Sequence, residues 1–310
     1  MAGEVPRRTK DVSTSTGDKR QMTEPALRAL LAGLIDYAGL FPPAALPMAE
    51  AVANYAAYRD SPDAWALGRF VVPVARLTEF EASAGPRLRG TPWPLSALAE
   101  GVDLGAIVAF NARHAGRAVI EAVEARAASP ADLPALARLA AAAEVFVEIP
   151  VRDDPDALVA AIAAHGLRAK IRTGGVSADA FPSARDAARF LAACARHDVM
   201  FKATAGLHHP LRGEYSLTYT VDAPHGTMFG FLNVFLAASF LRRGLPVADV
   251  ALLLDERDSD AIRFSPQGVA WRGHSLDAAA LAEDRARFAL SFGSCSFREP
   301  IDDLSALQLL

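Results

Sequence analysis

The sequence predicts an α/β fold, a (β/α)8 TIM barrel in a single domain, with a long loop after strand 7 and a hairpin insertion before strand 8. Short apolar runs alternate with longer Ala/Leu/Arg runs of helical spacing, which is typical of parallel βαβ units. Eight runs qualify as strands, and eight favours a closed barrel over an open sheet. No Gly-x-Gly-x-x-Gly follows an early strand, which disfavours a dinucleotide-binding sheet.

The strand candidates are short and rich in β-branched residues. They span residues 33–40, 70–74, 93–98, 118–123, 145–149, 167–173, 199–204 and 292–297. The third is weak because Pro94 lacks the N–H that a strand ladder uses. The eighth is weak as well, so the barrel prediction depends on counting both.

Helical spacing marks the segments between these strands. We expect helices over residues 47–58, 130–142, 155–165, 183–197, 227–243 and 276–290. Ser183 is placed to act as an N-cap. The helix over 227–243 is almost wholly apolar, which predicts burial on all sides. A polar loop covers 206–226, and residues 262–271 read as a hairpin turning at Gln267-Gly268.

Composition excludes several classes of protein. The chain has 310 residues, 52% of them hydrophobic, and a net charge of −4. No basic stripe is expected, so nucleic acid is not a predicted partner. The two cysteines, Cys194 and Cys295, do not make a disulfide framework or a cysteine-based zinc site. No cofactor is predicted.

The ends of the chain and its longest apolar run bear on location. Residues 1–21 are polar without a signal-peptide core, and we interpret them as a disordered tail before a barrel domain over 22–310. The apolar run 229–241 is too short to span a membrane. We therefore expect a cytoplasmic protein, without a membrane partner, that acts on a small molecule and that could form a homo-oligomer.

Lysine is nearly absent from the body of the chain. Only Lys10, Lys19, Lys170 and Lys202 occur, and the first two lie in the tail. The other two each stand in the middle of an apolar strand. Lysine is rarely buried without a partner or a task. Arginine cannot replace it where an amine must lose its proton and attack a carbonyl.

Strand periodicity brings these lysines to one place. Residues two apart on a strand share a face, so Lys170 lies with Arg172 and Lys202 with Thr204. Glu148 has the same register near the end of its strand. If the strands are neighbours, Glu148, Lys170 and Lys202 meet at one mouth. A neighbouring ammonium and an apolar wall both lower a lysine pKa, which favours the nucleophilic amine. The alternative is a pair of structural ion pairs.

These segments resemble the deoxyribose-phosphate aldolase family of class I aldolase barrels. That family has a Lys-Thr-x-Thr-Gly type strand, then a Lys-x-Ser/Ala-Gly-Gly strand one helix later, and a final Gly-x-Ser-Ser strand. Here residues 170–175 read KIRTGG, 202–206 read KATAG and 293–296 read GSCS. The arginine at 172, the missing second glycine after 202 and the LHHP loop at 207–210 depart from the family pattern. Deoxyribose phosphate itself is therefore not the expected substrate.

The resemblance implies roles for individual residues. Lys170 would be the Schiff-base residue and Lys202 its modulator. Apart from the resemblance, the positions of Glu148 and His208 at the strand mouth make them candidates to move protons. Arg172, which departs from the family pattern, could hold an anionic group on the substrate, and the resemblance adds the final strand as a phosphate site. The remaining substrate-binding candidates are Thr173, Thr204, His209, Gly293, Ser294, Ser296 and Asp36.

Other polar residues allow more than one interpretation. His208 and His209 are adjacent, so their side chains diverge, and a metal site with His225 and Glu214 is an alternative to a catalytic imidazole. The 206–226 loop is either a lid or an oligomer contact. Asp36 follows a strand, where a capping role competes with a site role. Glu121 and Glu124 have opposite parity, so we expect at most one of them inside the barrel.

Three functions compete. The leading hypothesis is an aldolase-like lyase that forms a lysine Schiff base with a small phosphorylated or carboxylated carbonyl compound. The second is a metal-assisted hydrolase or isomerase using His208, His209, Glu148 and Asp36. The third is a metabolite-binding barrel without catalysis. The fold alone does not decide, because barrels host many chemistries.

Overall fold

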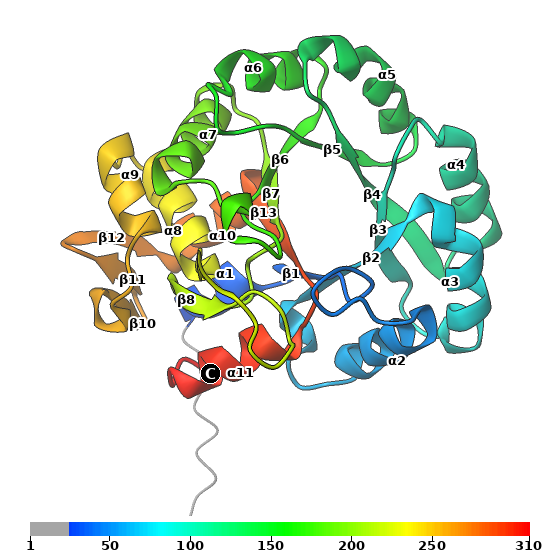
Figure 1. Cartoon of the computed structure of the whole chain (residues 1–310), viewed down its shortest axis with the longest axis horizontal. Helices are drawn as coiled ribbons and strands as arrows, with labels where there is room; N and C mark the ends of the chain where they lie inside the picture. Colours follow the sequence, from blue (N-terminus) through cyan, green and yellow to red (C-terminus); the bar gives the residue numbers. More distant parts are fainter. Residues whose placement is uncertain (1–24) are drawn as a thin grey trace, which may run out of the picture.

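A computed structural model describes residues 25–310, and the predicted tail over residues 1–21 lies outside this part. Eight parallel strands close into a barrel in the order β1-β13-β7-β6-β5-β4-β3-β2, ringed by helices (Figure 1). The predicted fold class is therefore confirmed. The barrel strands are β1 (Ile35–Tyr37), β2 (Leu67–Pro73), β3 (Trp93–Leu98), β4 (Ala118–Arg126), β5 (Glu144–Glu148), β6 (Arg168–Arg172), β7 (Phe201–Thr204) and β13 (Ala289–Ser294).

The structure contains five helices that the sequence analysis did not predict, namely α1 (Pro25–Leu31), α3 (Leu77–Ala84), α4 (Leu104–Arg113), α9 (Val247–Leu254) and α11 (Arg298–Ala306). Alternation of strand and helix requires α3 and α4, but their short apolar runs carry weak helical periodicity. Ser183 does cap its helix, since its Oγ accepts a hydrogen bond from Asp186 N. The other helices are α2 (Met48–Arg59), α5 (Leu133–Ala137), α6 (Asp156–Ala164), α7 (Ala184–Arg196), α8 (Phe231–Arg242) and α10 (Ala278–Arg287).

The last barrel strand lies earlier than the predicted span of 292–297. It begins at Ala289, directly after α10, and pairs Ile35 with Phe292 and Ala289 with Phe201. The predicted helix over 276–290 was too long at both ends, because its first residues belong to a strand that Asp277 terminates as the N-cap of α10. No glycine or proline separates α10 from β13, so periodicity alone could not place the boundary.

The insertion before β13 is a three-stranded antiparallel sheet of β10 (Ile262–Ser265), β11 (Gly268–Trp271) and β12 (His274–Asp277). The predicted turn at Gln267-Gly268 was wrong by one residue. Ser265 pairs with Gly268, so Pro266 and Gln267 form the turn. The glycine serves a different need, because a Cβ on it would lie 2.0 Å from the Leu276 carbonyl oxygen.

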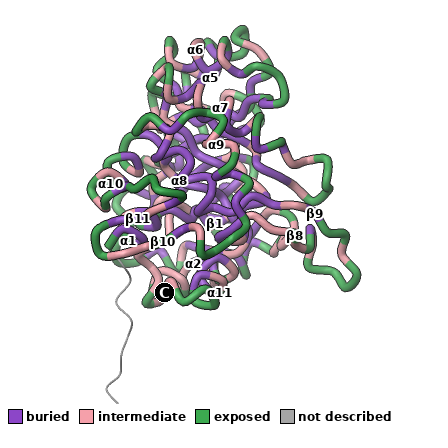
Figure 2. Tube along the Cα trace, turned by 90° about the vertical axis from the view of Figure 1, so that its left-hand side faces the viewer, coloured by how far each residue is buried: buried purple, intermediate pink, exposed green. Residues whose placement is uncertain are grey.

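The long loop after β7 contains a second hairpin, formed by β8 (Gly213–Ser216) and β9 (His225–Met228). Its tip is exposed and projects from the body of the molecule (Figure 2). We expected a loop up to residue 226 and a helix from residue 227. Residues 225–228 instead belong to this hairpin, and α8 begins at Phe231. As predicted, α8 is buried on all sides from Phe231 to Phe240. No helix among residues 25–310 is long and apolar enough to cross a membrane.

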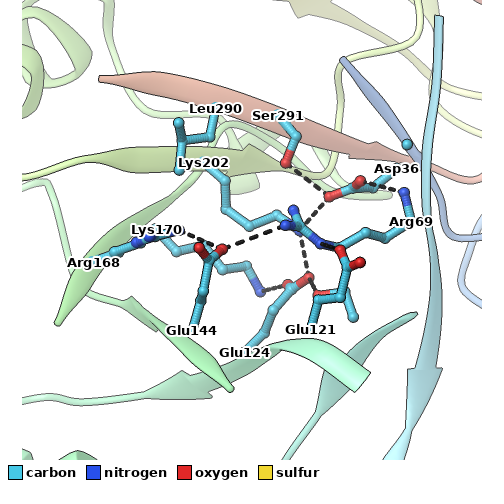
Figure 3. Close-up of polar contacts among 12 residues, drawn as sticks. Asp36, Arg69, Glu121, Glu124, Glu144, Arg168, Lys170, Lys202, Leu290 and Ser291 are labelled. Carbon is cyan, nitrogen blue, oxygen red and sulfur yellow. Dashed lines mark hydrogen bonds and ion pairs between the residues drawn. The ribbon is translucent and has the colours of Figure 1, made fainter. Parts of the chain in front are cut away.

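The barrel interior is filled with charges. Arg69 of β2 reaches Glu144 of β5, and Lys202 of β7 reaches Glu124 of β4. Neither pair belongs to neighbouring strands, so these contacts cross the inside of the barrel (Figure 3). Barrels of this class usually pack layers of Val, Ile and Leu there. In this barrel the apolar core lies mainly between the strands and the helices.

A register shift in β4 changes which residues face inward. Ile120 pairs with Leu95 and Ala122 with Ser96, so Glu121 is an extra residue in the ladder. Such a bulge interrupts the alternation of side chains. Glu121 and Glu124 therefore both face the interior (Figure 3). The prediction that at most one of them would do so was wrong.

Candidate active site

A cavity of about 250 Å³ opens at the carboxyl ends of the barrel strands. Its wall comes from the loop after β1, from β2, β3, β4, β6, β7 and β13, and from the loops after β6, β7 and β13. Active sites of (β/α)8 barrels lie at this end. The predicted site residues that line it are Lys170, Arg172, Thr204, His208 and Gly293. Glu124 lines it too, although it was not among the predicted site residues.

Ladder pairing brings the two lysines and Glu148 together. Glu148 is the register partner of Lys170, and Lys170 is the register partner of Lys202. The three side chains therefore start at the same level of adjacent strands, as periodicity suggested. The lysines are nonetheless unequal, because Lys170 lines the cavity and Lys202 does not.

Lys170 lies between two carboxylates. Its Nζ is 2.7 Å from Glu124 Oε2 and 2.9 Å from Glu148 Oε2, and its side chain is 3% exposed. These are ion pairs at the inner wall of the cavity. An amine here meets any molecule that enters the cavity, which Lys202 cannot do.

Lys202 is enclosed behind it, with a side chain 1% exposed. Its Nζ donates to Asp36 Oδ2 at 2.7 Å and to Glu124 Oε1 at 2.5 Å. Burial alone would lower the pKa of Lys202, but the carboxylates of Asp36 and Glu124 outweigh burial and raise it. The expectation that the barrel wall would favour a neutral amine therefore does not hold for Lys202.

Glu124 joins the two lysines. One of its oxygens contacts Lys170 and the other accepts from Lys202 and from the Ser96 hydroxyl at 2.7 Å. Burial would raise the pKa of the Glu124 carboxyl, but the two ammonium groups outweigh it and hold the pKa well below its usual range. The sequence offered one signal, since Glu124 is a charged residue near the end of an apolar strand. The sequence did not show whether Glu121 or Glu124 faces inward, because the bulge at Glu121 breaks the alternation of side chains along β4.

Asp36 completes the inner cluster from β1. Its Oδ2 accepts from Lys202 and from the Ser291 hydroxyl at 2.8 Å, and its Oδ1 accepts from Arg69 N at 2.7 Å. The close approach to β2 requires Gly68, because a Cβ there would lie 2.4 Å from Asp36 Oδ1. Asp36 thus positions Lys202, while the cavity itself is lined by other residues.

Glu148 lies at the outer edge of the cluster. Its Oε1 accepts from Arg172 Nε at 3.0 Å, and Arg126 Nε is 3.4 Å away. Burial would raise the pKa of Glu148, but Lys170 and Arg172 outweigh it and lower the pKa. Glu148 is therefore ionised at neutral pH, and it bridges the lysine and the arginine.

His208 belongs to a second polar group at the other side of the cavity. Its Nδ1 is 3.2 Å from Glu299 Oε2, 3.4 Å from Ser294 Oγ and 3.9 Å from Cys295 Sγ. Burial would lower the pKa of His208, but Cys295 and Glu299 outweigh burial and raise it to about 9. The imidazole is therefore positively charged at neutral pH and suits proton donation.

The other predicted residues have contacts inside the protein. Thr173 Oγ1 donates to the carbonyls of Thr204 and Ala205, which ties β6 to β7. His209 stacks on Tyr215 and pairs with Asp303 at 2.6 Å. Ser296 Oγ accepts from Glu299 N at the start of α11.

The donors of the metal hypothesis do not gather. The rings of His208 and His209 are 6.4 Å apart and tilted; both lie near Glu299, at 3.2 Å and 4.0 Å, and His209 pairs more closely with Asp303. Glu148 and Asp36 are engaged by lysines. Within residues 25–310, no three His, Cys, Asp or Glu side chains are arranged to hold a metal ion.

No protein-family model, curated protein or solved structure matches this chain. The resemblance to class I aldolase barrels therefore depends on the residues of the site and the order of its strands.

Proposed function

We propose that this protein is an aldolase-like lyase in which Lys170 forms a Schiff base with a small anionic carbonyl substrate. The observation that carries the proposal is the surroundings of the Lys170 Nζ. It lines the cavity at the carboxyl end of the barrel, 2.7 Å from the buried Glu124 carboxylate. A nucleophilic lysine needs both access to a carbonyl and a group that accepts its proton.

Glu124 would serve as that group. The Lys170 ammonium would pass a proton to Glu124, and the neutral amine would add to the carbonyl carbon. Because Lys170 and Lys202 hold the pKa of Glu124 low, Glu124 would keep the proton only briefly. It would return the proton to the carbonyl-derived oxygen, take a second proton from the nitrogen of the carbinolamine, and pass that proton to the same oxygen, which then leaves as water as the protonated iminium forms.

Lys202 would act through its charge. Its two carboxylate partners keep it protonated, and its ammonium group shares the Glu124 carboxylate with Lys170, so it would stay a fixed counter-charge for Glu124 during the reaction. The iminium then serves as the electron sink when a carbon–carbon bond breaks. In that step Glu148, 2.9 Å from Lys170 Nζ, would accept the proton of the substrate hydroxyl.

His208 would act as a proton donor, whereas Glu148 would act as a proton acceptor. With a pKa of about 9 it carries a proton at neutral pH, and it lines the cavity beside the end of β13. It would protonate or stabilise negative charge that develops on the substrate. This use of a cationic imidazole fits the cavity better than use as a base.

Borohydride trapping tests the proposal. The protein would be incubated with aldehydes, ketones and 2-oxo acids, reduced with sodium borohydride, and mapped by peptide mass spectrometry. We expect a reduced adduct on Lys170 and none in Lys170→Met. A folded protein that gives no adduct with any compound would reject the Schiff-base function.

A further inference from the structure

A second hollow, of about 560 Å³, opens at the same mouth of the barrel, over the ends of β4, β5 and β6. Three arginines line it. Arg126 is the last residue of β4, Arg152 lies in the loop after β5, and Arg172 is the last residue of β6. Arg172 also lines the cavity of Lys170, so the two spaces share one wall.

The guanidinium groups are accessible in this hollow. The side chains of Arg126 and Arg172 are 71% and 41% exposed, and each meets Glu148 Oε1 only through its Nε. Arg152 donates from one Nη to the carbonyl of Asp179. Among the described residues, the terminal nitrogens of Arg126 and Arg172 have no hydrogen-bond partner, so they can donate to a ligand.

The charges of the hollow favour an anion. Three guanidiniums face two carboxylates, those of Glu148 and Asp153. Glu148 is also paired with the Lys170 ammonium. The lining therefore keeps a positive surplus at the mouth. Converging guanidiniums with free N–H groups bind the oxygens of carboxylate and phosphate groups in pairs.

The opposite side of the mouth is less suited to an anion. There the Ser294 hydroxyl lies beside His208, and the Ser296 hydroxyl accepts from the backbone of α11. The Glu299 carboxylate lies in the same group, 3.2 Å from His208. The serines that the family resemblance assigned to anion binding are thus already engaged within the protein.

We propose that the hollow lined by Arg126, Arg152 and Arg172 is an oxyanion subsite for the substrate of Lys170. This inference rests on the proposed function and adds a constraint on the substrate. An anionic group attached directly to the carbonyl carbon would stay in the Lys170 cavity. To reach Arg126 and Arg152 beyond the shared wall, the oxyanion must be several bonds away from the carbonyl. The substrate class is an aldehyde or ketone with a distal phosphate or carboxylate.

Matched carbonyl pairs test the subsite. Borohydride trapping at subsaturating concentration would compare glyceraldehyde with glyceraldehyde 3-phosphate, and butanal with 4-oxobutanoate. The ratio of charged to uncharged adduct would be measured in the wild type, Arg126→Gln, Arg152→Gln and the double variant. Arg87→Gln, an exposed arginine after α3, is the matched control. We expect the ratio to fall at least about tenfold in the double variant and to stay unchanged in the control.

A binding measurement separates the two proposals. Calorimetry with inorganic phosphate would use Lys170→Met, with and without the two arginine substitutions. Phosphate binding that the arginine substitutions abolish supports the subsite, even if no carbonyl compound gives an adduct. Adducts on Lys170 whose charged-to-uncharged ratio is the same in the double variant would overturn the subsite and leave the Schiff base standing. The two carbonyl pairs also distinguish the anionic groups. A larger charged-to-uncharged adduct ratio for the glyceraldehyde pair indicates phosphate, and a larger ratio for the butanal pair indicates carboxylate.

Discussion

Lys170 and Lys202 occupy paired positions of β6 and β7, and their ammonium groups contact the two different oxygens of one carboxylate. That carboxylate belongs to Glu124, which lies across the barrel on β4. The pair therefore shares one counter-charge, while only Lys170 reaches the cavity. This asymmetry assigns different roles to two residues of the same type.

Replacement of Lys202 by arginine tests this difference. Lys202→Arg keeps a cation near Asp36 and Glu124, but a guanidinium cannot form an imine. We expect the borohydride adduct to remain on Lys170 and to form more slowly. The measurement is the rate of adduct formation followed by intact mass. An adduct that maps to Lys202 in the wild type would reverse the assigned roles.

Substitution of two glutamates of β4 compares the stability contribution of a buried carboxylate with that of an exposed one. Glu124→Gln leaves two buried lysines short of a carboxylate, which we expect to cost about 3–5 kcal/mol of unfolding free energy. Glu121 is exposed and contacts Arg69 at 3.2 Å, so Glu121→Gln should cost about 0–1 kcal/mol. Urea unfolding of both variants measures the difference. Equal losses would mean that the Glu124 cluster contributes little to the folded state.

His208 predicts a pH dependence of stability. Its pKa is about 9 in the folded protein, above the value of about 6.5 expected for an unfolded chain. A raised pKa stabilises the fold fully below pH 6.5, and this contribution is lost as pH rises through 9. The loss is on the order of 3 kcal/mol. Urea unfolding at pH 6.5 and 9.5 should show it in the wild type, and His208→Asn should lack it. Parallel pH dependence in both proteins would contradict the prediction.

Tyr219 anchors the hairpin of β8 and β9 to the barrel. Its hydroxyl donates to Glu299 Oε2 at 2.9 Å. Tyr219→Phe removes this hydrogen bond, which should lower the free energy of local opening by about 1 kcal/mol. We therefore expect amide hydrogen exchange to accelerate about fivefold in Gly213–Met228. Tyr58→Phe, in α2, is the control. Unchanged exchange in the hairpin would show that its position depends on other contacts.

The sequence predicted the fold because strand and helix alternate clearly over most of the chain. Pro94 weakened the third strand, yet the structure accommodates it without loss. The pairing of β3 with β2 begins at Leu95, so no residue of β2 is left without a hydrogen bond because Pro94 lacks an N–H. The end of α10 was not predictable, because local sequence does not mark where a helix passes directly into a strand.

The site was predictable where it depends on neighbouring strands. The periodicity of Glu148, Lys170 and Lys202 sufficed, because parallel neighbours align in register. Glu124 was not assigned, because its position depends on a bulge in β4 and on contacts that cross the barrel. Contacts between non-adjacent strands follow from barrel closure, which no local pattern describes.

The inner cluster also bears on how this chain folds. Asp36 and Lys202 are separated by 166 residues, and Glu124 and Lys202 by 78. Their contacts form only when β1, β4 and β7 are all in place, after long loops have been closed at an entropic cost. A fragment that ends before β7 would hold Asp36 and Glu124 without their shared cation. We therefore expect Lys170 with its carboxylate partners and the closed barrel to appear in the same kinetic step of refolding, so that, under the proposed function, capture of an aldehyde by Lys170 reports completion of the fold.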